Sequence, residues 1–213
     1  ASKDAYVTYK LFERFRPALG GMTIDGGCYP NMWEYYTKTE LPFTRVLYSM
    51  ERVGVPVNSD LLLKMAPKLE EEQIAIQKCF GKKMRRLYVN PQSVDEMSNL
   101  FFESLNREPL SFTQGGAPQL NEASLEVWAE GGCEYAKNLL RYRRVRKRLS
   151  TYVSNLLDHT CPDGKIHATF SQTGARTGRI SSKDPNLQNQ PGWIREAYEA
   201  DEGSVLLASD YNQ

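Results

Sequence analysis

The sequence has few of the residues that build disulfides and zinc sites. Its four cysteines lie far apart without a Cys-x-x-Cys pair, and only His159 and His167 are available to complete a zinc site. We therefore expect the cysteines to be free, reduced thiols.

Long hydrophobic runs are also absent. No apolar run approaches the roughly 20 residues that cross a bilayer, and the N-terminal stretch ASKDAYVTYKLFERF is too polar for a signal peptide. We predict a cytoplasmic protein without contact to a membrane. The 213 residues and their 40% hydrophobic content are sufficient for one or two domains with real cores.

An excess of one charge is missing overall, because the formal net charge is +1. Net charge averages over surfaces that face different partners, so the distribution of charged residues along the chain is more informative. The segment KNLLRYRRVRKR (137–148) contains seven Lys or Arg residues and no acid. Apolar residues recur there every three or four positions, which predicts a helix of more than five turns that packs by one stripe. That stripe comprises Leu139, Tyr142, Val145, Leu149, Tyr152 and Leu156.

The cations of this segment fall on the outward surface of the predicted helix. One row is Arg143, Lys147 and Thr151, and a neighbouring row is Arg141, Arg144 and Arg148. Two interpretations are open: a solvated face with acidic partners elsewhere in the chain, or a surface for a phosphate backbone. Cations together with the hydroxyls of Ser150 and Thr151 suit the phosphate backbone.

The rest of the chain is mostly helical before residue 162 and strand-like after it. We predict a helix over residues 1–16 that ends at Pro17, a Gly-rich flexible connection at 20–30, and helices from 31 to 160. We expect a kink or restart at Pro67, and loops at 90–93 and 113–118. Ile166, Ala168 and Phe170 alternate with polar residues as in a half-buried strand, and residues 205–208 fit a strand covered on both faces.

The segment TGARTGRISSKDPNLQNQP (173–191) has almost no large apolar residues but many hydrogen-bonding groups. Its composition favours a long surface loop, and a loop this long in a compact domain is usually functional or disordered. Thr177-Gly178-Arg179 would let the backbone approach a ligand while an arginine reaches out. The amides of Asn186, Gln188 and Asn189 can read acceptors in a DNA minor groove.

Asp210 comes two residues after the end of the predicted buried strand over 205–208. A carboxylate at the C-terminal end of a strand is where open α/β sheets place functional groups, and hard oxygen ligands suit Mg²⁺. Aspartates also end many strands by capping turns, so a catalytic and a structural role are both open for Asp210.

Together these segments are similar to one family. The stretches HATFSQTGARTGRISSKDPNLQNQP (167–191), IREAY (194–198) and SDYNQ (209–213) resemble the start of the polymerase palm in family A DNA polymerases, the bacterial DNA polymerase I type. ELPFTRVLYSMERVGVPVN (40–58) and RYRRVRKRLSTY (141–152) are similar to the segment before the thumb and to the basic helix of the thumb. ASKDAYVT (1–8) resembles the last motif of the 3′-to-5′ exonuclease domain.

The resemblance covers essentially the whole chain and implies three regions. Residues 1–30 would be the C-terminal end of an exonuclease-like domain and a linker, 31–162 a helical thumb region, and 163–213 the start of the palm. The implied fold class is mixed α/β and predominantly helical, with a helical thumb region followed by the first strands of an antiparallel palm.

The implied activity is that of a DNA-directed DNA polymerase, which transfers nucleotides from dNTPs to a primer 3′-hydroxyl with two Mg²⁺ ions. By position, Asp210 would bind both ions and the backbone carbonyl of Tyr211 would bind one, while Asp4 would be a metal-binding carboxylate of the exonuclease site. The residues expected to contact primer-template DNA are Arg143, Lys147, Ser150, Thr151, Thr177, Arg179, Asn186, Gln188 and Asn189.

Some positions depart from the family pattern. The link from Pro191 to Ile194 is short, which hints at a phage-type member, and residues 119–121 replace a Ser/Thr-rich turn that contacts DNA. The fingers, the second palm aspartate and the other exonuclease carboxylates lie outside these 213 residues. We therefore expect this chain alone to be inactive, with the fingers and the remaining palm supplied by a longer protein or a separate chain.

Two other interpretations of the sequence are open. One is a stand-alone or split-subunit module that binds the primer-template duplex without catalysis, built around the thumb. The other is a relative of the single-subunit RNA polymerases, which the extended TGRISSKDPNLQN match disfavours.

Overall fold

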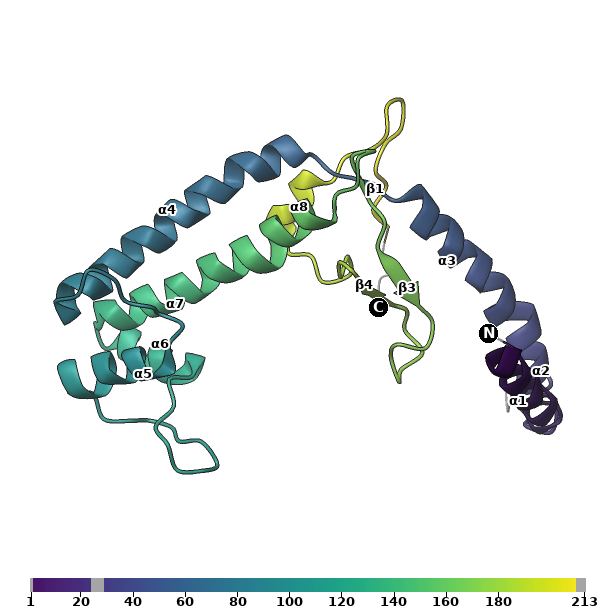
Figure 1. The fold of residues 1–213 in the computed structure, drawn as a ribbon, viewed down its shortest axis with the longest axis horizontal. Coiled ribbons are helices and arrows are strands. Elements are labelled where there is room, and N and C mark those ends of the chain that lie inside the picture. Colours follow the sequence, from purple (N-terminus) through teal and green to yellow (C-terminus); the bar gives the residue numbers. More distant parts are fainter. Residues whose placement is uncertain (1, 24–28, 210–213) are drawn as a thin grey trace. The chain divides into compact units, whose positions relative to one another are not determined.

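The computed structural model describes residues 2–23 and 29–209. The fold is predominantly helical, with a few short strands, two of which form an antiparallel hairpin, which confirms the expected fold class (Figure 1). Backbone contacts divide the chain into two compact units. The first unit contains Ala1–Val55 and Lys165–Asn189, and the second contains Pro56–Gly164 and Gln190–Gln213. No helix in the described ranges is both long and apolar enough to span a membrane.

The first unit contains helices and a small hairpin. Helix α1 (Ser2–Gly20) is followed by the consecutive helical segments α2 (Met32–Tyr35), η1 (Tyr36–Glu40) and α3 (Leu41–Val53). Strand β2 (Lys165–Ile166) precedes β3 (Thr169–Ser171), which pairs antiparallel with β4 (Ser181–Lys183). In this hairpin Thr169 lies opposite Lys183 and Ser171 lies opposite Ser181.

Helix α1 does not end at Pro17, so the predicted boundary is wrong. Proline removes one amide donor from a helix, but the ladder resumes because the backbone amide of Gly21 donates to the carbonyl of Pro17 at 3.1 Å. No residue of α1 is buried. The helix is held instead by surface contacts to Trp33, whose ring centroid lies 5.8 Å from that of Phe12. Residues 24–28 of the predicted Gly-rich connection lie outside the described residues.

The second unit is built on two long helices. Helix α4 (Ser59–Met84) lies beside a helix formed by α7 (Glu134–Lys147), η3 (Arg148–Ser154) and α8 (Asn155–His159), as Figure 1 shows. Between them in sequence come α5 (Val94–Ser98), η2 (Asn99–Ser104) and α6 (Glu122–Glu130), and α6 packs on α7. The short helix η4 (Gly192–Ala197) follows later, and strand β1 (Val55–Pro56) lies where the chain passes between the units.

The main core lies where α4, α5, α6 and α7 meet. Its aromatic centre includes Phe101 stacked on Trp128 at 5.4 Å between ring centroids. The buried cluster comprises Ile76, Phe80, Val89, Met97, Leu100, Phe101, Leu125, Trp128, Cys133, Ala136, Leu139, Leu140 and Tyr142. Cys79, Cys133 and Cys161 are free thiols, as predicted, and Cys28 lies outside the described residues.

Several local predictions for the second unit can be compared with its elements. The loops at 90–93 and 113–118 are confirmed. The restart at Pro67 is wrong, because α4 runs unbroken from Ser59 to Met84. Its start is fixed at Asn58, whose side-chain oxygen accepts a hydrogen bond from the amide of Leu61 at 2.8 Å.

The two strand predictions have different outcomes. Ile166 and Ala168 are buried, which confirms the alternation, although regular strand structure is interrupted between β2 and β3. The buried strand over 205–208 is wrong: the run is irregular, and Val205 and Leu207 are 87% and 90% exposed. A buried strand needs neighbouring strands on which to pair, and none of the strands in the described ranges pairs with this run.

Candidate nucleic-acid interface

The basic segment is part of one continuous helix that runs from Glu134 to His159 through α7, η3 and α8. Leu139, Tyr142, Val145 and Leu156 are buried, as the stripe predicts. The middle of the stripe is shifted, because Val153 is fully buried whereas Leu149 and Tyr152 are only partly covered. The shift coincides with the π-helical segment η3, whose hydrogen bonds join residues five apart and widen the turn.

The row formed by Arg143, Lys147 and Thr151 is exposed, as predicted. Arg143 and Lys147 make no ion pair within residues 2–23 and 29–209, although they line a pocket that also contains Glu122. Partial desolvation lowers the pKa of the Arg143 guanidinium from its ordinary value, and the charge of Glu122 acts in the opposite direction. An arginine remains protonated at neutral pH in either case.

The hydroxyl groups of Ser150 and Thr151 are not equivalent. Ser150 is exposed and its hydroxyl donates to the carbonyl of Arg146 at 2.9 Å. Thr151 is also exposed. Ser150 therefore has to change its hydrogen-bond partner before it can donate to a phosphate.

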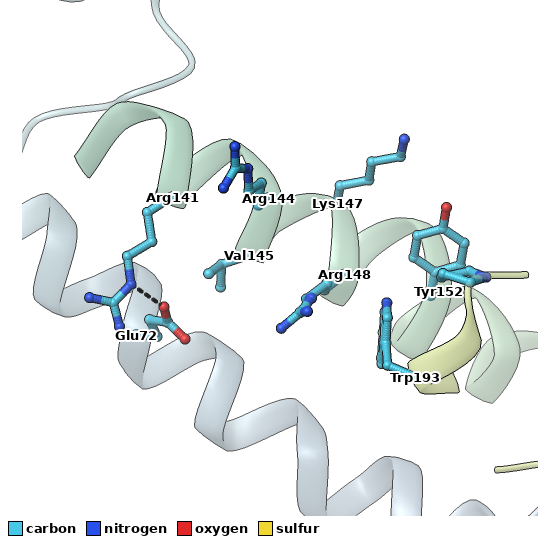
Figure 2. A pocket seen from close by; sticks show the side chains of 9 residues that line it. Glu72, Arg141, Arg144, Val145, Lys147, Arg148, Tyr152 and Trp193 are labelled. Carbon is cyan, nitrogen blue, oxygen red and sulfur yellow. Dashed lines mark hydrogen bonds and ion pairs between the residues drawn. The ribbon is translucent and has the colours of Figure 1, made fainter. Parts of the chain in front are cut away.

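The second cation row has partners that the sequence did not predict. Arg141 forms an ion pair with Glu72 of α4, so an acidic partner elsewhere in the chain exists for this one position. The guanidinium of Arg148 lies 5.1 Å from the ring centroid of Trp193. The same ring contacts Tyr152 edge-on at 5.7 Å. These residues line a groove between α4 and the basic helix (Figure 2).

The segment from 173 to 191 is only partly the long loop that its composition favours. Ser181–Lys183 forms strand β4, and residues 172–180 connect it to β3. Thr177 and Arg179 are exposed in this connection. Gly178 between them has a φ of 75°, a left-handed conformation that favours glycine. A Cβ atom on Gly174 would overlap the side chain of Ser181, so the approach of the two hairpin arms requires glycine there.

After β4 the chain folds back in a turn that is held by hydrogen bonds. The buried hydroxyl of Ser182 donates to the carbonyl of Pro185 and accepts from the amide of Leu187, both at 3.2 Å. The side-chain amide of Gln188 donates to the carbonyl of Ile180 at 2.8 Å. The amides of Asn186, Gln188 and Asn189 are thus exposed on a turn with defined geometry.

Segment η1 and helix α3 hold the other arm of the hairpin. The carboxylate of Glu51 accepts a hydrogen bond from the backbone amide of Phe170 at 2.6 Å. The side-chain amide of Gln172 donates to the carboxylate of Glu40 at 2.7 Å and accepts from the hydroxyl of Thr44 at 2.9 Å. Sequence reasoning missed these contacts, because Glu51 and Phe170 are far apart in the chain and neither stands out locally.

The predicted site residues fall into separate groups. Arg143, Lys147, Ser150 and Thr151 lie on one helix of the second unit, and Thr177, Arg179, Asn186, Gln188 and Asn189 lie on one hairpin and its following turn in the first unit. Asp4 lies in the exposed first turn of α1. Asp210 and Tyr211 lie outside the described residues.

Exposed cations along one helix, and an exposed arginine and amides on a hairpin, are features of a nucleic-acid-binding protein. The model of DNA polymerase family A matches residues 59–213. The chain therefore belongs to DNA polymerase family A.

Individual relatives agree with this membership. DNA polymerase I of Pseudomonas aeruginosa is 33% identical over 220 residues, which cover 100% of this chain and 23% of that protein. The thermostable DNA polymerase I of Thermus filiformis is 33% identical over 224 residues, covering 100% of this chain and 25% of that protein. This chain thus spans about a quarter of the length of these curated relatives.

A solved structure has a similar fold. It is the POL domain of Pol1 from M. smegmatis in a complex with DNA primer-template and dNTP. The TM-score is 0.72 at 28% sequence identity, over 80% of this chain and 31% of that chain.

Proposed function

We propose that this chain is part of a DNA-directed DNA polymerase that extends a primer along a DNA template. Its membership of DNA polymerase family A carries the proposal. The similar M. smegmatis domain is in a complex with DNA primer-template and dNTP, which supports the same partners for the complete protein to which this chain belongs. Arg143 and Lys147 are exposed and make no ion pair with another described residue, so they suit the phosphates of such a duplex.

The proposed division of labour follows the two groups of residues. Arg143 and Lys147 are one helical turn apart and hold the phosphate backbone, with Ser150 and Thr151 beside them. Arg179 and the amides of Gln188 and Asn189 contact the minor groove near the primer terminus, because purine N3 and pyrimidine O2 present similar acceptors there in every base pair. Thr177 and Asn186 flank these contacts.

The proposed metal ligands are oxygen atoms. The carboxylate of Asp210 and the backbone carbonyl of Tyr211 are hard donors of the kind that Mg²⁺ prefers. Two bound ions would stabilise charge on the attacking and leaving oxygens of the transfer. Asp4 is proposed as one carboxylate of an exonuclease metal site. The proposed regions are an exonuclease-like end and linker over 1–30, a helical thumb over 31–162 and the start of the palm over 163–213. Cytoplasmic location and phage origin remain predictions.

Complementation of activity tests this function. A polypeptide of these 213 residues alone is expected to give no primer extension with Mg²⁺ and dNTPs, since it contains Asp210 but not the second palm aspartate of the family. Addition of a polypeptide with the fingers and the remaining palm should restore extension. Asp210→Asn should abolish the restored activity, whereas Asp201→Asn, at an exposed aspartate nine residues earlier in the chain, should retain it.

Two outcomes would contradict the proposal. Extension that persists undiminished in the Asp210→Asn variant would exclude its role in catalysis. A complemented protein that binds primer-template duplex but never extends the primer would favour a duplex-binding module without catalysis.

A further inference from the structure

The groove of the second unit lies beside the row of Arg143 and Lys147 and shares Lys147 with it, but it has a different centre and composition. It is an open groove with a volume of about 400 Å³ between α4 and the basic helix. Figure 2 shows the Glu72–Arg141 ion pair at one end, the Trp193 ring at the other, and Val145 and Arg148 between them. The residues that line it are Glu72, Arg141, Arg144, Val145, Lys147, Arg148, Tyr152, Pro191 and Trp193. Arg143 is not among them.

The groove has an excess of positive charge. Its one carboxylate, on Glu72, is already paired with Arg141. Arg144, Lys147 and Arg148 have no ion-pair partner in the part of the chain that the structure describes. Arg144 and Arg148 are four residues apart on one helix, where like charges repel each other. An anion in the groove would relieve this repulsion.

The ring of Trp193 orients the guanidinium of Arg148 for binding of such an anion. The guanidinium lies over the indole ring at 5.1 Å from its centroid, within the range of a cation–π contact. A planar guanidinium that is held on one face still presents its N–H donors at the edge, and this fork matches the oxygens of a phosphate. Because the ring already orients the side chain, less conformational entropy is lost when the phosphate binds.

The remaining surface of the groove is apolar and aromatic. Tyr152 and Trp193 meet at an interplanar angle of 87°, and Val145 and Pro191 lie near them in the lining. Aromatic side chains of this kind stack with bases that are not already stacked in a duplex. The groove therefore offers cations for a phosphate and rings for an unpaired base within one cavity.

We propose that this groove binds a nucleoside phosphate, with the phosphate at Arg144 and Arg148 and the base against Trp193 and Tyr152. The nucleoside phosphate is either one nucleotide of a single DNA strand or a free nucleotide. This site is additional to the duplex contact at Arg143, and it does not depend on polymerase activity.

Binding of a fluorescein-labelled oligo-dT strand to the 213-residue chain, followed by anisotropy, tests the proposal. Arg148→Gln should weaken binding at least about threefold and reduce the slope of log K against log salt by about 0.7, the contribution of one phosphate contact to a single strand. The matched control is Arg146→Gln, an exposed arginine on the same helix that is absent from the groove lining. Equal effects of the two variants would overturn the proposal.

The aromatic part of the site is tested in two ways. Trp193→Leu should weaken oligo-dT binding at least about fivefold through loss of stacking. Because Trp193 is partly buried beside Ile194, photo-crosslinking of 5-iododeoxyuridine oligonucleotides to the unchanged chain provides a measurement without a mutation. Crosslinks to peptides that contain Tyr152 or Trp193 support the site, and crosslinks confined to other peptides refute it.

Two further measurements distinguish a free nucleotide from a single strand, and the groove from the duplex contact at Arg143. If dTMP displaces oligo-dT at a similar nucleotide concentration, the groove accepts a free nucleotide; if only unlabelled oligo-dT competes, it requires a strand. Arg143→Gln should weaken duplex binding and leave oligo-dT binding unchanged. If Arg143→Gln weakens oligo-dT binding as much as Arg148→Gln does, the groove is not a separate site and the proposal fails. If Arg143→Gln leaves duplex binding unchanged, the proposed duplex contact is contradicted, but the proposed groove site is not.

Discussion

Replacement of Ser182 by alanine is expected to loosen the turn that carries Gln188 and Asn189. Ser182 is only 6% exposed, and its hydroxyl donates to Pro185 and accepts from Leu187. Alanine fits the same space but removes both hydrogen bonds. A net hydrogen bond contributes about 1 kcal/mol, so the free energy of opening this turn should fall by about 2 kcal/mol.

Hydrogen exchange of the Leu187 backbone amide measures this change directly, since that amide donates to the removed hydroxyl. A loss of about 2 kcal/mol corresponds to exchange that is about 30-fold faster, because each 1.4 kcal/mol is a factor of ten. Ser181→Ala is the matched control: it is the adjacent serine, and its hydroxyl makes no hydrogen bond to another residue of the described ranges. If the Leu187 amide exchanges at the same rate in Ser182→Ala as in the unchanged chain, the reasoning about this turn is refuted.

Three further predictions concern the second unit. The double variant Arg143→Gln/Lys147→Gln should reduce the slope of log K against log salt for duplex DNA by about 1.8, since each phosphate contact contributes about 0.9; an unchanged slope in a salt titration would contradict the duplex contact. Leu139→Ala removes a fully buried side chain and should lower the free energy of unfolding by about 2–5 kcal/mol in urea denaturation, and a change below this range would show that Leu139 is not a core residue. Burial raises the pKa of Tyr198 to about 12, so its neutral form favours folding and that stability is lost as the pH rises from 10 toward 12. Tyr198→Phe should remove this alkaline loss, measured by melting at pH 8, 10 and 11, whereas an identical loss in both proteins would assign it to another group.

Helical structure was predictable wherever apolar residues recur at a constant spacing. The stripe through Leu139, Tyr142 and Val145 correctly identified the buried face of the basic helix. The same rule assumed 3.6 residues per turn throughout, so it placed Tyr152 rather than Val153 in the core. Pro17 and Pro67 show a related error, because a proline inside a helix costs one hydrogen bond but can be accommodated when the neighbouring turns remain intact.

Burial and long-range contacts were less predictable than periodicity. Residues 205–208 are apolar, but apolarity does not name the strands on which a segment would pair, and this run is exposed. Glu72 and Arg141 are 69 residues apart, and nothing in the local sequence of either predicts their ion pair. Trp193 was also overlooked, although a large aromatic residue directly after a long polar segment is a signal that could have drawn attention to it.

The types of exposed residue in the candidate site were predictable, but the strand and long-range contacts that position them were not. The density of hydrogen-bonding residues in 173–191 correctly indicated exposed side chains at Thr177, Arg179 and Asn189. The sequence did not indicate that Ser181–Lys183 would form a strand or that α3 would hold its partner through Glu51. These features depend on residues from distant segments meeting, which a local pattern does not encode.

The π-helical segment Arg148–Ser154 also has a consequence for how the basic helix tolerates changes in length. A turn closed by hydrogen bonds between residues five apart contains one residue more than an α-helical turn needs. Deletion of one residue inside this segment could therefore be absorbed by conversion to ordinary α-helix, with Val145 and Leu156 both kept in the core. A deletion within α7 would instead rotate every following side chain by about 100°, since an α-helix turns once in 3.6 residues. Insertions and deletions among homologues of this helix should accordingly concentrate between residues 148 and 154.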